Sequence, residues 1–265
     1  SEKIINYELL QISFNIACIK FQISNYKKYI AKFYIEKKNK FNAINSEKKN
    51  LEYLNKKFNF FPKVIKSNKK ILIMEYLKNN NEKPSFTNSD FLDAMIKMHS
   101  ISSTEYGFSF NTQIGAIKQN NGFKNSWVDF YANSRLGDIL EIANKKERLE
   151  RKINNKIFLL IKNMKNFIPN NPKPLLLHGD LWEGNILFDN KKFVGFIDPG
   201  SFFGHSEMEV AYLRWFDPLF IDSKFLEKYN DKISLEKNYL DYEPVYQLYF
   251  ALCNVALWDK SYIKE

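Results

Sequence analysis

A short polar segment in the second half of the chain has the residue types that phosphoryl transfer needs. Residues 178–185 read His-Gly-Asp-Leu-Trp-Glu-Gly-Asn, and Asp198 follows the apolar run that ends at Ile197. The reaction asks little covalent chemistry of a protein, because it depends on holding the acceptor oxygen in line and neutralising the phosphate charge. Asp180 can orient a hydroxyl group and accept its proton, whereas Asn185 and Asp198 offer the hard oxygen ligands that Mg²⁺ prefers. We therefore expect Asp180 to be a catalytic base and the other two residues to be metal ligands.

The spacing of these residues follows the pattern of a kinase catalytic loop. That pattern is H-x-D-L-x-x-x-N followed by D-x-G, and here Gly179 stands in the Arg position and Pro199 in the Phe position. Taken singly, Asn185 could form an Asx turn and Asp198 could be a turn residue before proline. Their occurrence together, in this order and between apolar runs, favours a functional site.

The first part of the chain supplies partners for such a site. Lys32 lies within the apolar run 29–35, which is typical of a strand, and a lysine in that setting usually has a charged partner. Glu47 lies on the next predicted helix, where its carboxylate can hold Lys32 near the phosphates of ATP. The end of the strand expected at 71–74 predicts a hinge whose backbone binds adenine, made of Met74, Glu75 and Tyr76.

Two other residues of the motifs invite a functional interpretation. Trp182 is next but one to Asp180, which makes it a candidate substrate contact, although the aromatic residues of this half are mostly core candidates. His99 and His178 lack the spacing of a metal pair, so we expect His178 to support the catalytic loop instead.

The elements that must position these residues change in character near Tyr76. Before it the chain predicts strands at 16–19, 29–35, 64–65 and 71–74 with a helix at 43–58, and after it mainly helices. The later helices are expected at 89–99 (with Ser89 as N-cap), 126–140, 145–167, 207–216 and 245–258, with short strands at 175–177 and 193–197. The sequence thus predicts an α+β chain with a small β-rich N-lobe, residues 1–76, and a larger mainly helical C-lobe, residues 77–265.

Composition narrows the class of protein. The chain has 265 residues, of which 45% are hydrophobic and 16% aromatic, and this is a globular composition. No apolar run reaches the length of a membrane span, the first residues do not form a signal peptide pattern, and two cysteines make no disulfide framework. The net charge of +10 comes mostly from scattered Lys, and Arg, which base readout usually recruits, is scarce. We expect a cytoplasmic protein that binds neither nucleic acid nor membrane, and its oligomeric state stays open.

Residues 177–185 and 197–207 resemble the fructosamine (ketosamine-3) kinase family. Trp182 and the stretch Ser-Phe-Phe-Gly-His-Ser-Glu after Gly200 favour this family over its relatives, the aminoglycoside phosphotransferases and choline kinases. The resemblance runs from about Cys18 to the C-terminus. It implies a two-lobed protein-kinase-like fold, ATP and Mg²⁺ as cofactors, the residue roles given above, and phosphorylation of a ketoamine (a glycated amine) on its sugar.

The phosphate-covering loop departs from the family pattern. Family members carry glycines there, whereas the matching stretch Ser13–Cys18 has none, and positive φ is costly for other residues. Family members often have a cysteine in this loop, and Cys18 falls at that position. A nearby Lys32 would favour its thiolate, so we treat Cys18 as a candidate redox site, the alternative being an inert apolar residue of the strand.

Two other functions remain open at this point. One is a kinase of the same fold that acts on another hydroxyl, such as that of an aminoglycoside, choline or a small sugar. The other is a degenerate pseudokinase that binds nucleotide without turnover, for which the glycine-free loop is the support.

Overall fold

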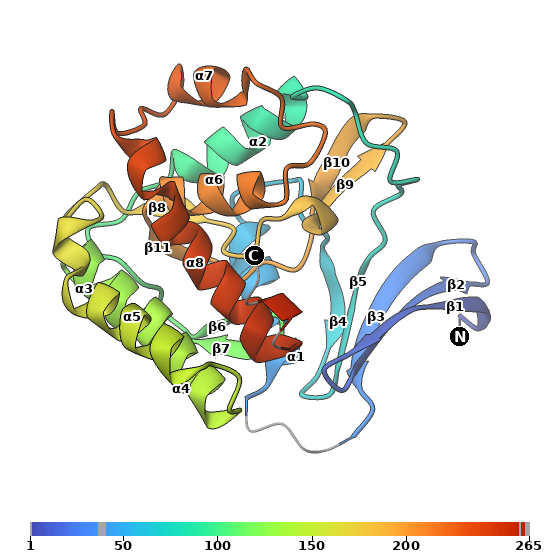
Figure 1. Cartoon of the computed structure of the whole chain (residues 1–265). Coiled ribbons are helices and arrows are strands. Elements are labelled where there is room, and N and C mark those ends of the chain that lie inside the picture. Colours follow the sequence, from blue (N-terminus) through green and yellow to red (C-terminus); the bar gives the residue numbers. More distant parts are fainter. Residues whose placement is uncertain (1, 37–40, 260, 263–265) are drawn as a thin grey trace. The chain divides into compact units, whose positions relative to one another are not determined.

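The computed structural model describes residues 2–36, 41–259 and 261–262, and the chain divides into two compact units. The first unit comprises Ser1–Lys83 together with Gly184–Pro199, and the second comprises Pro84–Glu183 together with Gly200–Glu265. Their helices and strands are labelled in Figure 1.

The first unit is built on a five-stranded antiparallel sheet. Its strands are β1 (Ile4–Ser13), β2 (Ile16–Ile23), β3 (Lys28–Tyr34), β4 (Val64–Ser67) and β5 (Ile71–Glu75), in the order β1-β2-β3-β5-β4. On one face of β2, Ala17, Phe21 and Ile23 are buried and Ile19 is partly buried, as expected for a strand that packs one face against a core. The helix α1 (Ala43–Leu54) begins at Asn42, whose side chain accepts a hydrogen bond from the Asn45 amide at 2.9 Å.

Strand β1 is absent from the sequence prediction, and the helix expected at 43–58 ends at Leu54. β1 is exposed along nearly its whole length, with Tyr7 71% exposed. Its apolar residues come in adjacent pairs such as Ile4-Ile5 and Leu9-Leu10, so it lacks the alternation that marks a half-buried strand. Only its pairing with β2 defines it.

The second stretch of the first unit is a β-hairpin. Strands β9 (Ile186–Asp189) and β10 (Lys192–Phe196) pair, and the Phe196 amide donates to the Phe60 carbonyl at 2.9 Å. Gly195 also lies against the Phe60 backbone, where a Cβ would approach the carbonyl oxygen to 2.5 Å.

This unit therefore extends past Tyr76, where the sequence placed the lobe boundary, and it includes residues that the linear division assigned to the second lobe. The reason is that strand pairing and packing join segments far apart in the chain. The division of the chain into an N-lobe, residues 1–76, and a C-lobe, residues 77–265, stays a prediction.

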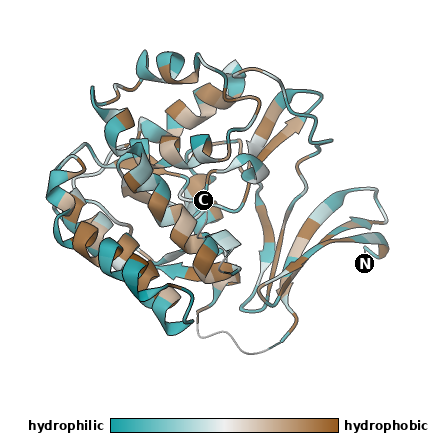
Figure 2. Cartoon of the chain, in the orientation of Figure 1, coloured by the Kyte–Doolittle hydropathy of each residue, from teal (hydrophilic) through white to brown (hydrophobic). Residues whose placement is uncertain are grey.

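The second unit is mainly helical. Its helices are α2 (Ser89–His99), α3 (Trp127–Tyr131), α4 (Asp138–Lys145), α5 (Arg151–Lys162), α6 (Ser206–Trp215), α7 (Phe225–Asn230) and α8 (Tyr239–Leu257). Two short antiparallel strand pairs accompany them, β6 (Thr112–Ile114) with β7 (Ile117–Gln119) and β8 (Leu175–Leu177) with β11 (Phe202–Gly204). Helix α8 packs against both α4 and α6, and hydrophobic residues recur along it (Figure 2).

The predicted helices of this unit differ from the observed ones mainly at their ends. The N-cap of α2 is Asn88 rather than Ser89, since the Asn88 side chain accepts from the Phe91 amide at 3.0 Å. The stretch 126–140 is interrupted by a π-helical segment, Ala132–Gly137, in which Arg135 is fully buried. Its guanidinium lies over two aromatic rings, 4.5 Å from the Phe130 centroid and 4.0 Å from that of Phe202.

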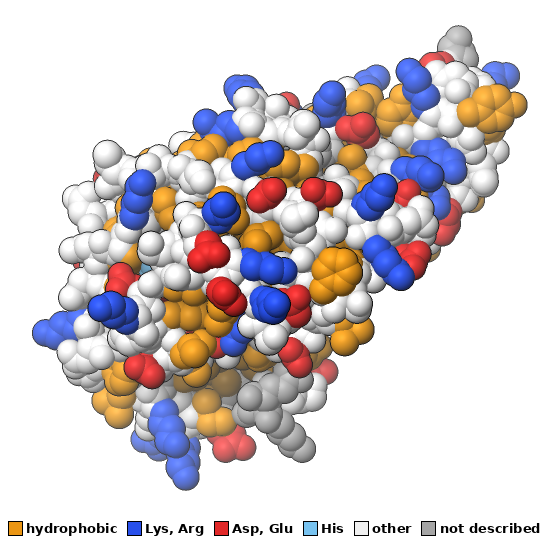
Figure 3. All heavy atoms as spheres, turned by 90° about the horizontal axis from the view of Figure 1, so that it is seen from above, with side chains coloured by type: hydrophobic (Ala, Val, Ile, Leu, Met, Phe, Trp, Pro, Cys, Tyr) orange, Lys and Arg blue, Asp and Glu red, His pale blue; other side chains and the backbone are white. Residues whose placement is uncertain are grey.

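No helix among the described residues is both long and apolar enough to cross a lipid bilayer. On the face drawn in Figure 3, Lys and Arg side chains lie dispersed among acidic and apolar ones rather than in one patch. That distribution agrees with a solvated basic surface on this face.

Candidate functional site

The loop that carries Asp180 follows β8 and requires glycine at residue 179. Gly179 has a φ of +85°, and a Cβ there would lie 2.2 Å from the carbonyl oxygen of Gly200. The Gly200 amide in turn donates to the His178 carbonyl at 2.9 Å. Both the left-handed backbone and the close approach exclude any larger residue, which accounts for glycine in place of the Arg of the kinase pattern.

A buried carboxylate on α6 holds this loop. The Oε2 of Glu209 accepts from the His178 amide at 2.9 Å, and its Oε1 accepts from the Gly179 amide at 2.7 Å. Nε2 of His99 lies 2.9 Å from Oε2 of the same carboxylate. Burial alone would raise the pKa of Glu209, but the hydrogen bond and charge of His99 and the loop amides lower it. The carboxylate thus stays charged and fixes the backbone next to Asp180.

His99 and His178 both serve this support. His99 reaches the Tyr229 hydroxyl through Nδ1 at 2.8 Å, and Nδ1 of His178 accepts from the Asp180 amide at 3.3 Å. Within the described residues there is no group of three or more His, Cys, Asp and Glu side chains that could hold a metal ion.

Aromatic side chains lie beside Asp180. The Tyr212 hydroxyl lies 3.4 Å from Oδ1 of Asp180. The Tyr212 ring is 5.6 Å from that of Phe216, and the Phe216 ring is 5.5 Å from that of Trp182. Trp182 is partly exposed and Phe216 is 39% exposed, so both can meet a ligand.

A second group of functional candidates meets in the first unit. Nζ of Lys32 on β3 lies 2.8 Å from Oε1 of Glu47 on α1, and it also bonds Oδ1 of Asp198. The side chains of Lys32 and Glu47 are only 13% and 5% exposed, whereas that of Asp198 is 42% exposed. The structure therefore joins three residues that lie far apart in the sequence.

The charges of this cluster depend on one another. Burial alone would lower the pKa of the Lys32 ammonium, but Asp198 and Glu47 raise it well above its ordinary value. Burial raises the pKa of Glu47, although Lys32 opposes that shift. Lys32 is consequently a permanent cation with one buried and one partly exposed carboxylate beside it.

Asn185 is tied to the strand that leads to Asp198. The Ile197 amide donates to the Asn185 backbone carbonyl at 3.0 Å, and Asn185 is 6% exposed. Asp198 itself has a φ of +56°, a left-handed conformation that is uncommon for aspartate. Such strain often accompanies functional positions, and here it occurs at a predicted metal ligand.

The predicted adenine hinge lies at the end of β5. Met74 is buried and pairs with Ile30 of β3, and the Glu75 amide donates to the Lys63 carbonyl at 2.9 Å. Tyr76 follows the strand, and Nζ of Lys20 lies 5.6 Å from the centroid of its ring.

The glycine-free loop forms the turn between β1 and β2. Phe14 and Asn15 there have φ of 50° and 67°, so the turn adopts the conformation that glycine would favour. Two hydrogen bonds to the Glu36 backbone stabilise Asn15 in this conformation. Its Nδ2 donates to the Glu36 carbonyl at 2.8 Å, and its Oδ1 accepts from the Glu36 amide at 2.9 Å. Asparagine tolerates the left-handed region better than most residues, and Phe14 bears the strain.

Cys18 lies opposite Lys32 in the pairing of β2 and β3. Burial raises the pKa of the Cys18 thiol to about 11, and Lys32 only partly offsets the effect. Lys32, the neighbouring cation that would favour a reactive thiolate, is present, but burial has the larger effect on the pKa of the thiol.

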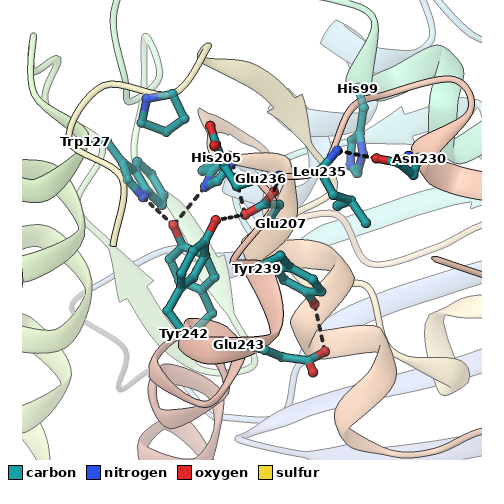
Figure 4. A network of polar contacts seen from close by, with 12 residues as sticks. His99, Trp127, His205, Glu207, Asn230, Leu235, Glu236, Tyr239, Tyr242 and Glu243 are labelled. Carbon is teal, nitrogen blue, oxygen red and sulfur yellow. Dashed lines mark hydrogen bonds and ion pairs between the residues drawn. The ribbon is translucent and has the colours of Figure 1, made fainter. Parts of the chain in front are cut away.

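Sequence reasoning assigned no role to the buried acidic residues of α6, of which Glu209 holds the catalytic loop. Glu207 and Glu209 lie within an otherwise apolar stretch of α6, and both are buried. Glu207 accepts from the Tyr242 hydroxyl and, at 2.6 Å, from the Glu236 amide (Figure 4). Burial raises the pKa of Glu207 to about 7, with the Tyr242 and Glu236 hydrogen bonds opposing. Two acidic residues in a largely apolar helical run could have indicated a structural role from the sequence, because buried charges need partners.

The comparisons with known proteins agree with this geometry. A family model described as fructosamine kinase matches residues 14–265, nearly the whole chain. The chain belongs to the fructosamine kinase family. Among the relatives, a probable ketoamine kinase of Enterococcus faecium is 31% identical over 175 residues, and the ketosamine-3-kinase of Mus musculus is 33% identical over 148 residues. These matches cover 65% and 56% of this chain, but only 62% and 47% of the relatives, which is less than two thirds of their length.

Solved structures show the fold of this fructosamine kinase family member. A candidate fructosamine-3-kinase from Thermobifida fusca superposes with a TM-score of 0.87 at 20% identity, covering 99% of this chain and 91% of that one. An aminoglycoside phosphotransferase, solved with streptomycin and ATP, superposes with a TM-score of 0.62 at 16% identity, covering 98% and 89%. The α+β kinase-like fold predicted from the sequence is thereby confirmed, as is the family.

Proposed function

We propose that this chain is an ATP-dependent kinase that transfers the γ-phosphate to a sugar hydroxyl of a ketoamine. The observation that carries the proposal is the cluster of Lys32, Glu47 and Asp198 in a chain of this family. A strand lysine paired with a helix glutamate, with an aspartate for Mg²⁺ nearby, is the arrangement that kinases use to engage the phosphates of ATP. The names of the relatives, ketoamine, ketosamine and ribulosamine kinases, support a glycated amine as acceptor.

Asp180 is the proposed catalytic base. The acceptor hydroxyl oxygen attacks the γ-phosphorus, its proton passes to the Asp180 carboxylate, and the bond from that phosphorus to the bridging oxygen breaks to release ADP. The glutamate-held loop gives the carboxylate a fixed position, and fixed geometry is most of what this reaction asks of a protein.

Asn185 and Asp198 are the proposed Mg²⁺ ligands. The fit rests on donor chemistry: Asp198 provides a partly exposed carboxylate, and Asn185 an amide oxygen at the end of the turn just before β9. Bound there, Mg²⁺ would offset phosphate charge. Lys32 adds a positive charge for the phosphates, and Glu47 keeps it in place.

The remaining roles concern recognition. We propose that the Met74–Tyr76 segment contacts adenine and that Trp182, with Phe216 beside it, contacts the acceptor. A glycated amine as acceptor calls for neither nucleic acid nor a membrane, and a cytoplasmic location fits a supply of ATP.

A coupled ADP-release assay over a panel of synthetic ketoamines tests the function. We expect turnover with fructosamine- or ribulosamine-type acceptors and little with aminoglycosides, choline or free sugars. Turnover with one of those instead would assign another substrate to the same fold. Nucleotide binding without ADP release on any acceptor would mean a pseudokinase and would refute the proposal.

A further inference from the structure

Helix α6 contacts the catalytic loop at two points that lie one turn apart. Glu209 accepts the amides of His178 and Gly179, and Tyr212, three residues later, places its hydroxyl 3.4 Å from Oδ1 of Asp180. Residues separated by three positions share one face of a helix. The same face therefore holds both the backbone before Asp180 and the carboxylate itself.

Tyr212 is itself firmly held. It is 6% exposed, and its ring stacks on that of Phe250 of α8 with centroids 3.6 Å apart and an interplanar angle of 5°. A ring clamped in this way gives its hydroxyl little freedom, so the oxygen is a fixed point beside Asp180. Burial, and next the charge of Asp180, hold the pKa of Tyr212 well above its usual value, which keeps the hydroxyl a donor.

The carboxylate of an aspartate rotates easily, because its terminal torsion is broad and roughly two-fold. One donor fixed on Oδ1 restricts that rotation. At 3.4 Å the contact is longer than a usual O–H···O hydrogen bond, and catalytic hydrogen bonds in a ligand-free enzyme often shorten only when substrate binds.

We propose that Tyr212 is a positioning residue for phosphoryl transfer, whose hydroxyl helps to fix the Asp180 carboxylate in the orientation that receives the acceptor proton. The inference rests on the proposed function, since it presumes that Asp180 is the base. It adds to that function a residue that acts through Asp180 and touches neither ATP nor Mg²⁺.

Tyr212→Phe removes the hydroxyl and keeps the stacked ring. We expect kcat to fall about tenfold, the value of one hydrogen bond to a charged acceptor, with KM for ATP and for the ketoamine within twofold of the parent. Tyr131→Phe is the matched control, because the Tyr131 hydroxyl is also buried but donates to the Val245 carbonyl at 2.6 Å. The control should lose thermal stability with kcat and KM unchanged.

Combining the variant with Asp180→Asn separates positioning from packing. The amide oxygen of Asn can still accept from Tyr212, but the side chain is no longer a base, so Tyr212→Phe should cause no further loss of kcat in that background. A tenfold loss in both backgrounds, or a kcat within twofold of the parent for Tyr212→Phe alone, overturns the inference and leaves the proposed function standing. An Asp180→Asn enzyme with parental kcat overturns both.

Discussion

The charged cluster of the first unit and the catalytic loop of the second are built on different physical principles. In the first, Lys32 bonds two carboxylates directly, one buried and one partly exposed. In the second, the neutral hydroxyl of Tyr212 lies beside Asp180, and the buried charge of Glu209 holds backbone amides of the same loop. The first arrangement suits the neutralisation of phosphate charge and the second suits the orientation of one carboxylate.

This difference predicts how each region responds to substitution. Charge removed from the first region leaves buried partners uncompensated, so both binding and stability suffer. Changes in the second region mainly alter geometry, so they should act on kcat with binding retained.

Asp198→Ala should have the largest effect. It removes the proposed Mg²⁺ ligand and one partner of Lys32, and we expect a loss of activity on the order of a thousandfold with little productive Mg²⁺·ATP binding. Asn185→Ala should cost less, because a neutral ligand contributes less attraction. Titrating Mg²⁺ against both variants checks the order, and an unchanged magnesium dependence in the two would remove these residues from the metal site.

Asp180→Asn should come next. We expect kcat to fall by on the order of a hundredfold or more while ATP binding and the fold stay nearly intact, because only proton acceptance and orientation are lost. Steady-state kinetics together with nucleotide titration measure the two effects separately. Activity within a few-fold of the parent would exclude Asp180 as the base.

Glu207 provides a smaller, pH-dependent test of the second region. Burial raises the pKa of its carboxyl to about 7, above the ordinary value of 4.5. A carboxyl group with a raised pKa favours the folded state when it is protonated. Its contribution to the free energy of unfolding is therefore fully present below about pH 4.5 and is lost as the pH rises through 7. Glu207→Gln should therefore flatten the decline of Tm between pH 5 and 8 by roughly 5–10 °C. An identical pH profile in thermal unfolding would show that Glu207 does not titrate there.

Cys18 should give the smallest effect. Because its thiol pKa is raised to about 11, little thiolate exists at neutral pH, and we expect peroxide or diamide to inactivate the parent and Cys18→Ser equally and slowly. Assays before and after reduction provide the measurement. A rapid, reversible loss that is absent in Cys18→Ser would instead establish a redox switch.

The sequence was informative where chemistry requires particular residue types at particular spacings. A lysine on a predicted strand and a carboxylate on the next predicted helix led us to expect a contact between Lys32 and Glu47, and the structure contains that contact. The direct bond from Lys32 to Asp198 did not follow, because it joins residues that no local pattern relates.

The supports of the catalytic loop were beyond local reasoning. Glu209 and Tyr212 act through tertiary contacts, and α6 alone does not show which loop they meet. Strand β1 was missed because pairing rather than burial defines it, and the Asn88 cap because Ser89 offers the same chemistry one residue later.

The central claim is that this chain moves the γ-phosphate of ATP onto a ketoamine. Incubating the enzyme with Mg²⁺·ATP and a fructosamine-type acceptor, and following both products by ³¹P NMR and mass spectrometry, tests that claim most directly. The account predicts one phosphoester on the sugar for each ADP formed, and the near-absence of both products with Asp180→Asn. ADP accompanied by free phosphate, with the ketoamine unchanged, would contradict it.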